Sequence, residues 1–136
     1  MADNFLLEIT TPVCLVLSDE VEMVTAPGTE GEFGVLAGHT DFLTTLSAGV
    51  LRYKKDGKDV FMAVSRGYAE VAPDKTTILV ASAQLSADIN VEEARQMLKE
   101  AEDAIAGNKD DQTGLNEAKE KLELAEALIS TSEKPH

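Results

Sequence analysis

The sequence has one cysteine, few basic residues and no long hydrophobic run. The single thiol, Cys14, cannot form an internal disulfide, and it rules out a cysteine-rich zinc site. The chain carries 25 acidic residues against 12 basic ones, a formal net charge of −13, which should repel phosphate backbones and anionic lipid surfaces. Its longest apolar stretches, such as 13–17, are much too short to cross a membrane. We therefore expect a protein that binds no nucleic acid and reaches a membrane only through a partner.

Targeting signals are also absent from the amino terminus, which has no basic start, no apolar run and no Arg/Ser-rich transit pattern. What remains is the composition of a globular protein, because 43% of the 136 residues are hydrophobic and 27% are charged. This length predicts one ordinary domain, or a smaller domain with an appendage.

The pattern of the chain changes near residue 86. All six aromatic residues, three of the four prolines and seven of the nine glycines precede this point, whereas the remainder is rich in Ala, Glu, Lys and Leu. We therefore divide the chain into a β-rich domain, 1–86, and a helical domain, 87–136.

The first part contains short β-rich runs separated by turn residues, with no helix-length segment between them. Asp56-Gly57 between two such runs is a strong hairpin signal, because glycine accepts the positive φ of a primed turn. The pattern predicts an antiparallel β-sandwich or barrel. The expected strands are 5–10, 13–18, 21–26, 50–54, 60–65, 67–72 and 76–82.

The second part has the three- and four-residue spacing of amphipathic helices. Asn90 is a good N-cap, with Glu93 three residues later as in a capping box, and Gly107-Asn108 marks the end of this helix. A second helix is expected after Asp110-Asp111. The short connection predicts an antiparallel helical hairpin, and alanines on both apolar stripes allow close packing. The tail, 130–136, should fray.

No set of residues in the sequence supports a catalytic site. His39 is the only histidine before the terminus, and no paired acid or base accompanies it. Cys14 lies in an apolar run and is expected to be a buried, inert thiol. Ser65 lies between two strands rather than between the strand and helix of a nucleophile elbow. We therefore expect a non-catalytic protein with no cofactor and no metal.

The stretch 28–49 has a functional and a plain structural interpretation. Its glycines cluster as in a phosphate-binding loop, but no Lys-Ser/Thr follows them. Acidic pairs, Glu30/Glu32 here and Asp110/Asp111 later, could bind divalent ions weakly, although solvated turns are far commoner. Repeated glycines with apolar anchors predict a rigid surface loop, which either connects strands or contacts a protein partner.

Within this stretch, residues 30–39 read Glu-Gly-Glu-Phe-Gly-Val-Leu-Ala-Gly-His. This resembles the hallmark Glu-Gly-Glu-apolar-Gly-apolar-apolar-Pro-Gly-His of the epsilon subunit of the rotary F-type ATP synthase, in its bacterial type. Residues 64–71 resemble that family's Ser-Gly-Gly-apolar-apolar-Glu-Val segment, and 89–95 resemble its hinge into the first helix. Ala37 replaces the usual proline, and Arg66 stands where a glycine is common. The resemblance covers essentially the whole chain and implies the same sandwich and hairpin.

The resemblance implies a non-catalytic central-stalk subunit at the cytoplasmic face of a bacterial inner membrane, held there peripherally by its complex. The sandwich would contact the gamma subunit and the ring of c subunits. The acidic charge of the chain suits docking against cationic partner surfaces. The residues implied in this interface are Glu30, Gly31, Glu32, Gly38 and His39.

The hairpin is implied to move between a state folded on the sandwich and an extended state. The extended hairpin would reach the alpha and beta subunits and inhibit ATP hydrolysis. Lys119 and Lys121 are the residues of the second helix that could make this contact. They lie among glutamates at 117, 120, 123 and 126, which is unfavourable for meeting an acidic partner, so we expect weak inhibition.

A nucleotide sensor is the alternative function. Some members of the family bind ATP through an Ile/Leu-Asp-x-x-Arg-Ala motif at the start of the first helix. The matching window here, 91–96, keeps an acidic residue, Glu92, and Arg95, which would be the main phosphate contact. Equilibrium dialysis with ATP, with and without Arg95→Ala, distinguishes a sensor from a stalk subunit.

Overall fold

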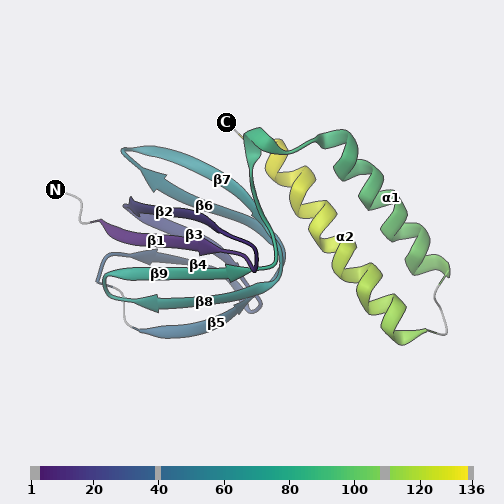
Figure 1. Ribbon diagram of the computed structural model, residues 1–136, viewed down its shortest axis with the longest axis horizontal. Coiled ribbons are helices and arrows are strands. Elements are labelled where there is room, and N and C mark those ends of the chain that lie inside the picture. Colours follow the sequence, from purple (N-terminus) through teal and green to yellow (C-terminus); the bar gives the residue numbers. More distant parts are fainter. Residues whose placement is uncertain (1–3, 39–40, 108–110, 135–136) are drawn as a thin grey trace.

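The computed structural model describes residues 4–38, 41–107 and 111–134. In these ranges the chain forms ten β-strands, then a short 3-10 helix and two α-helices (Figure 1), so the predicted order of a β-rich part and a helical part is confirmed. The strands are β1 (Phe5–Thr10), β2 (Leu15–Val21), β3 (Met23–Gly28), β4 (Gly31–Leu36), β5 (Phe42–Leu46), β6 (Gly49–Lys55), β7 (Lys58–Val64), β8 (Gly67–Ala72), β9 (Lys75–Val80) and β10 (Ala83–Leu85). The helices are η1 (Ser86–Asp88), α1 (Val91–Gly107) and α2 (Gln112–Ser132).

The strands form a β-sandwich, as predicted. One layer contains β10, β7, β6, β3 and β4, and the other contains β5, β8, β9, β1 and β2. The layers join where Gly28 of β3 pairs with Leu46 of β5. Inward side chains of alternate residues fill the space between them, as the two-residue period of a strand requires. One pair departs from the predicted antiparallel arrangement, because β1 runs parallel to β9.

The tight turn between β6 and β7 was predicted from its sequence. Asp56 and Gly57 both have positive φ, 51° and 76°, which is the backbone of a primed hairpin turn. The strands it joins pair from Gly49↔Val64 to Lys55↔Lys58 without a shift in register.

The prediction of a loop over 28–49 is wrong, because β4 and β5 lie within it. β4 pairs with β3 around a turn at Thr29 and Glu30. In β4 buried and exposed positions alternate around Val35, which is buried between two exposed neighbours. The glycines of this strand make that alternation hard to recognise in the sequence. A glycine adds no side chain to either face, so the two-residue pattern is weak in the sequence.

Cys14 is exposed, which contradicts the prediction of a buried thiol. It lies in the turn between β1 and β2, where its amide N donates to Thr11 Oγ1 at 3.3 Å and its carbonyl accepts from the Thr11 amide at 2.9 Å. β2 begins only at Leu15 and is an edge strand. A continuous apolar run therefore does not prove burial when the run enters an edge strand through a turn.

Both helices begin at the caps that the sequence indicated. The Glu93 amide donates to Asn90 Oδ1 at 3.2 Å, and the Gly114 amide donates to Asp111 Oδ1 at 3.2 Å. Each contact satisfies an amide that has no partner within the helix. Alanines do fill the contact between the helices, where Ala94, Ala101, Ala118 and Ala125 are buried.

The prediction that the chain frays from residue 130 is wrong for its first residues. α2 continues to Ser132, and Thr131 is fully buried with its hydroxyl donating to the Ala127 carbonyl at 2.7 Å. The last turn holds because its side chains pack, although they lack the apolar spacing of the helix before them. In the described part of the chain, neither helix combines the length and apolarity needed to cross a membrane.

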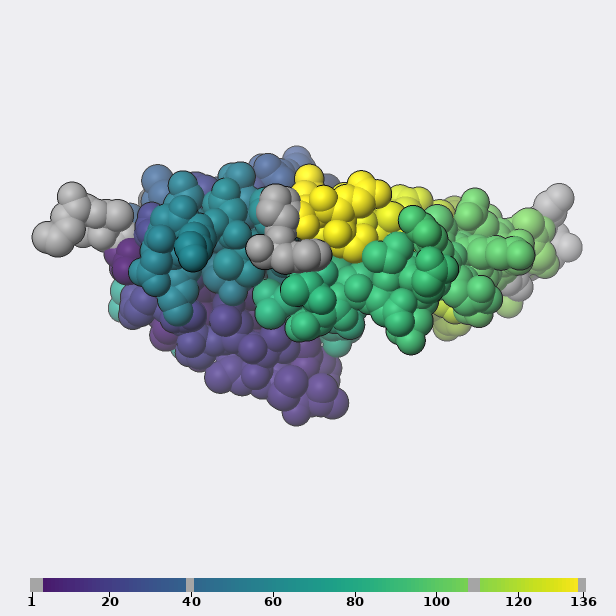
Figure 2. Space-filling model, turned by 90° about the horizontal axis from the view of Figure 1, so that it is seen from above, coloured from purple at the N-terminus to yellow at the C-terminus, as the bar shows by residue number. Residues whose placement is uncertain are grey.

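The hairpin projects from one end of the sandwich. α2 contacts β6 and β7 and lies between the sandwich and most of α1, while the connected ends of the helices point away (Figures 1 and 2). A small apolar cluster joins the two parts, formed by Ala63 of β7, Ala94 of α1 and Leu128 of α2. We call it the junction core.

Thr76→Val is expected to raise the free energy of unfolding by about 1 kcal/mol. Thr76 is fully buried in β9, and its hydroxyl has no hydrogen-bond partner among the described residues. Urea denaturation measures the change. Thr131→Val is the matched control and should give no such gain, because the Thr131 hydroxyl already donates to a carbonyl. A loss of stability in Thr76→Val would show that its hydroxyl is satisfied.

Candidate protein-binding surface

The outer face of the β5-β8-β9-β1-β2 layer carries a row of side chains with little polarity. Tyr68 pairs with Leu79 on one side and with Thr45 on the other, while Thr10 lies between Leu79 and Leu15. Each has a strand neighbour that is buried in the core or packed against it, so these five side chains point outward. Tyr68 and Leu15 are each 55% exposed and Leu79 is 43% exposed. We call these five residues the outer row.

The next row on the same face is more polar. Glu8, Thr77 and Glu70 lie side by side there, and the row ends in Leu43, which is 70% exposed. The apolar surface is therefore a narrow stripe bordered by carboxylates. Contiguous exposed apolar side chains with a polar border are typical of sites where another protein binds.

The segment 65–67 leads directly into Tyr68 and fixes its position in the outer row. The Ser65 amide donates to the Ser82 carbonyl at 3.1 Å, and the Ser82 amide donates to Ser65 Oγ at 2.9 Å. These two hydrogen bonds connect the segment after β7 to the segment after β9. Gly67 follows directly, and a Cβ there would lie 1.9 Å from the Leu79 carbonyl oxygen. Only glycine lets β8 approach β9 this closely.

Two hollows flank Tyr68. One, of about 420 Å³, lies towards the β1–β2 turn, and the other, of about 570 Å³, lies towards the β3–β4 turn. Arg66, Gly67 and Tyr68 line both. The first is mostly apolar, so this surface can accept apolar side chains of a partner. Within the described ranges, no three His, Cys, Asp or Glu side chains are grouped closely enough to hold a metal ion.

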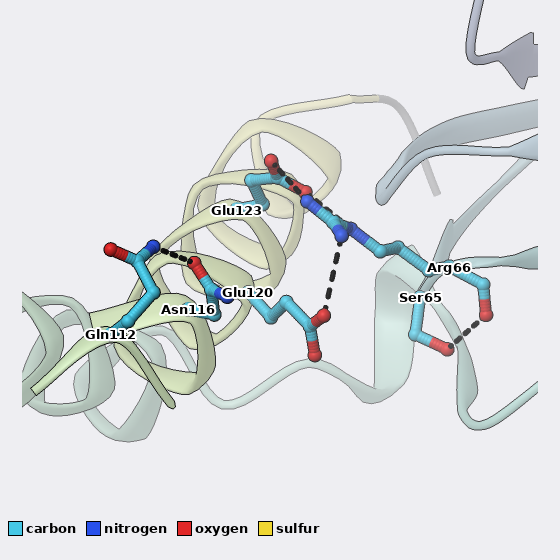
Figure 3. A network of polar contacts seen from close by, with 6 residues as sticks. All are labelled: Ser65, Arg66, Gln112, Asn116, Glu120 and Glu123. Atoms are coloured by element: carbon cyan, nitrogen blue, oxygen red, sulfur yellow. Dashed lines mark hydrogen bonds and ion pairs between the residues drawn. The ribbon is translucent and has the colours of Figure 1, made fainter. Parts of the chain in front are cut away.

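Arg66 connects the sandwich to α2 (Figure 3). Its Nε donates to Glu123 Oε2 at 3.0 Å, its Nη2 to Glu123 Oε1 at 2.8 Å, and its Nη1 to Glu120 Oε1 at 3.2 Å. The hydrogen bond to Glu123, together with both negative charges, raises the pKa of the Arg66 guanidinium above its ordinary value. Arg66 is therefore charged at neutral pH.

The turn that carries Glu30 lies at the hairpin end of the sandwich. Thr29 beside it hydrogen-bonds to Thr45, through the backbone at 3.1 Å and between hydroxyls at 2.6 Å. Glu30 and Glu32 are both exposed, and Gly31 between them has a φ of +126°. The predicted site residues at 30–32 thus form one rigid acidic turn.

Gly38 lies at the other end of β4. Its amide donates to the Pro73 carbonyl at 2.8 Å, beside the β8–β9 turn. The intervening strand, Gly31–Leu36, spans about 20 Å. The structure therefore does not bring Gly38 together with the acidic turn. His39 lies outside the described residues, and the interface role of all five residues stays a prediction.

The predicted residues of the helices lie on exposed surfaces. Arg95 Nη1 contacts Glu92 Oε1 at 3.4 Å, one turn away on α1. Lys119 is exposed on α2, whereas Lys121 donates from Nζ to Glu100 Oε2 of α1 at 3.0 Å. The bond from Lys121, and a weaker contribution from Gln96, lower the pKa of Glu100 below its ordinary value. Lys121 thus joins the two helices of the hairpin.

The outer row is not predicted by the sequence pattern alone. In β8 and β9 the alternation is clear, but Tyr68 and Leu79 are apolar residues on the side where polar ones are expected. This departure from alternation was the available signal. To interpret these residues as one surface row requires the pairing of five strands, which no local sequence pattern indicates.

The sequence of the chain matches a known family. The model of the family described as "ATP synthase, Delta/Epsilon chain, beta-sandwich domain" matches residues 4–86. A protein named "ATP synthase epsilon chain" from Desulforapulum autotrophicum is 50% identical over 107 residues, which is 78% of this chain and 79% of that protein. A protein of the same name from Trichlorobacter lovleyi is 51% identical over 105 residues, covering 77% and 76%.

Solved structures resemble the chain as well. A chain in the Euglena gracilis mitochondrial ATP synthase structure, described as "OSCP/F1/c-ring in rotational state 1", aligns with a TM-score of 0.80 and 27% identity, over 93% of this chain and 80% of that one. A chain in the "central stalk/cring" structure of the Tetrahymena thermophila enzyme has a TM-score of 0.62. At 16% identity, and with coverage of 96% and 97%, this second likeness shows the fold alone.

Proposed function

Because the chain belongs to the ATP synthase delta/epsilon family, whose epsilon chains are non-catalytic subunits, we propose that it is the central-stalk epsilon subunit of a bacterial F-type ATP synthase. In that role it links the gamma subunit to the ring of c subunits, and its hairpin regulates ATP hydrolysis. It needs no cofactor of its own. The complex holds it peripherally at the cytoplasmic face of the inner membrane.

The exposed outer row is the observation that supports a contact with the gamma subunit. The charge of a highly acidic chain favours solubility, so an uncovered stripe that contains Leu15, Tyr68 and Leu79 needs another explanation. Covering the exposed half of one such side chain contributes about 1 kcal/mol. Glu8 beside the stripe is already paired with Lys75, so Glu70 is the bordering carboxylate that favours a partner with apolar residues next to a basic one.

The acidic turn is the proposed contact with the c ring. Strand pairing on both sides holds Glu30 and Glu32 in fixed positions, so little conformational freedom is lost on binding. Basic or polar groups on the loops of the ring would pair with the two carboxylates. Gly38, beyond the far end of β4, is proposed to contact gamma or the ring away from the acidic turn, and the same role is proposed for His39, which follows it in the sequence.

Titration of the purified chain into a matched catalytic core, with and without gamma, tests the proposal. Binding and ATP hydrolysis are read together. Binding that depends on gamma supports the stalk role, and an accompanying fall in rate gives the strength of inhibition. No binding in the presence of gamma, at low and at moderate salt, would overturn it.

Removal of the hairpin by truncation after Ala87 is expected to change the rate of ATP hydrolysis by at most about twofold, because exposed charges with compensating neighbours contribute little. Lys119 lies among glutamates of α2, and Lys121 is already bound to Glu100. Steady-state hydrolysis by the reconstituted core measures the change. Strong inhibition by the full chain that disappears on truncation would contradict this expectation.

A further inference from the structure

The outer face of the β10-β7-β6-β3-β4 layer carries an arginine near its middle. Thr25 of β3 pairs with Arg52 of β6, and Arg52 pairs in turn with Phe61 of β7. Each of the three has a neighbour along its strand that is buried, so all three side chains point outward, away from the core. Arg52 therefore lies between a hydroxyl-bearing residue and an aromatic one, and it is only partly exposed.

Arg52 is unusual in this chain because no carboxylate pairs with it in the described ranges. The sequence has 25 acidic residues and 12 basic ones, so carboxylates are in excess. The other two arginines, Arg66 and Arg95, each contact a glutamate, whereas Arg52 has no ion pair among the described residues. Residues 49–64 include four basic and two acidic ones, so the β6–β7 hairpin is positive in a chain of net charge −13.

A hollow of about 310 Å³ lies beside Arg52. The described residues that line it combine two cations, one carboxylate, one hydroxyl and two apolar side chains: Arg52, Lys134, Glu32, Thr25, Val50 and Phe61. Lys134 follows the end of α2, and its amide donates to the Thr131 carbonyl at 3.0 Å. This hydrogen bond holds the backbone of Lys134 to the last turn of the helix, so the second cation has a defined position.

The charges and the apolar surface of the hollow together define the ligand that fits it. Two cations against one carboxylate leave one positive charge in excess, which favours a ligand with a single negative charge. A guanidinium pairs with a carboxylate through two parallel N–H···O bonds, so the free donors of Arg52 suit a carboxylate group. Val50 and Phe61 provide apolar surface for the rest of the molecule, as in most small-molecule sites.

We propose that this hollow is a binding site for a small monocarboxylate with an apolar body. Arg52 holds the carboxylate, and Lys134 adds a second positive charge. Glu32 repels a second negative charge, which selects against dianions such as phosphate. The site lies on the layer opposite the outer row and shares none of its residues, so it does not depend on the proposed stalk function.

Titration of the full chain with phenylacetate, followed by nuclear magnetic resonance of the backbone amides, tests the proposal. The amide signals of Thr25, Arg52 and Phe61 should shift together and give a Kd of about 1 mM. Phenylacetamide is the matched control ligand. It has the same shape without the charge, so it should bind at least about tenfold more weakly. Inorganic phosphate supplies charge without an apolar body and should also bind at least about tenfold more weakly.

Arg52→Gln is expected to weaken the binding of phenylacetate about tenfold, because it removes the two-point pairing. Arg52→Lys keeps the charge without the planar fork and should lose about threefold. Glu32→Gln should strengthen binding about threefold, because it removes the repelling carboxylate. Arg95→Gln is the matched control variant. It deletes the same charge on the exposed surface of α1, so it should keep the parent affinity.

Four results would each overturn the proposed site. The first is no shift of the three amide signals below about 20 mM phenylacetate. The second is equal affinity of Arg52→Gln and Arg95→Gln, which would show that Arg52 does not hold the carboxylate. The third is equal binding of phenylacetate and phenylacetamide, and the fourth is binding of phosphate at least as tight as that of phenylacetate. The amide spectra also report the folding of each variant, and Arg52 lies outside the core.

Discussion

Replacing Gly67 with alanine is expected to lower the free energy of unfolding by about 3 kcal/mol or more. The new Cβ would lie 1.9 Å from the carbonyl oxygen of Leu79 and 2.9 Å from its carbonyl carbon. Both are backbone atoms of the paired strand, so no change of rotamer can relieve the clash. β8 and β9 would have to separate where Gly67 pairs with Val80.

Thermal unfolding followed by circular dichroism measures this loss, with an expected fall in Tm of roughly 10 °C. Gly34→Ala is the matched control, because Gly34 also lies in a strand but the nearest atoms to its new Cβ are 4.0 Å away. The control should keep the Tm of the parent chain. Equal stability of the two variants would mean that β8 and β9 leave room for a Cβ at Gly67.

Leu79→Asp is expected to weaken binding to a gamma-containing core at least about thirtyfold, which corresponds to about 2 kcal/mol. Leu79 lies at the middle of the outer row, between Tyr68 and Thr10. The change removes apolar area that a partner would cover, and it places a carboxylate where water would be excluded. Isothermal titration calorimetry gives the affinity.

A second leucine provides the control for this result. Leu36 is 60% exposed at the end of β4 and lies outside the outer row, so Leu36→Asp adds the same charge at a different place. It should bind with nearly the parent affinity. If both variants bound equally well, the outer row would not be the contact with gamma. If both lost affinity equally, the added charge rather than the position would be responsible.

The parts of the fold that follow from local patterns could be predicted from the sequence. The Asp56-Gly57 turn, the Asn90 cap and the alanine stripes each depend on residues close together in the chain. Together they indicated the sandwich and the hairpin. β4 was missed because its glycines remove side chains from the alternation, and Cys14 was misplaced because an apolar run continued through a turn.

The candidate site depends on pairings between distant residues, which no local pattern contains. The outer row exists only because five strands are paired in one register. Arg66 meets Glu123 across 57 positions of sequence, and nothing near Arg66 indicates that partner. The family resemblance located the acidic turn but not its geometry, since Glu30 and Gly38 prove to lie at opposite ends of a strand.

The parallel pairing of β1 with β9 also constrains the order in which the chain can fold as it is synthesised. Leu6 pairs with Lys75 and Thr10 with Leu79. β1 therefore cannot form this pairing until more than half of the 136 residues have been synthesised. During that time one edge of the β1–β2 pair is open to other chains. Contacts between residues far apart in the sequence form slowly. The β6–β7 turn and the two helices depend on residues close together in the sequence, so they form faster. The two helices are synthesised last, after every strand of the sandwich.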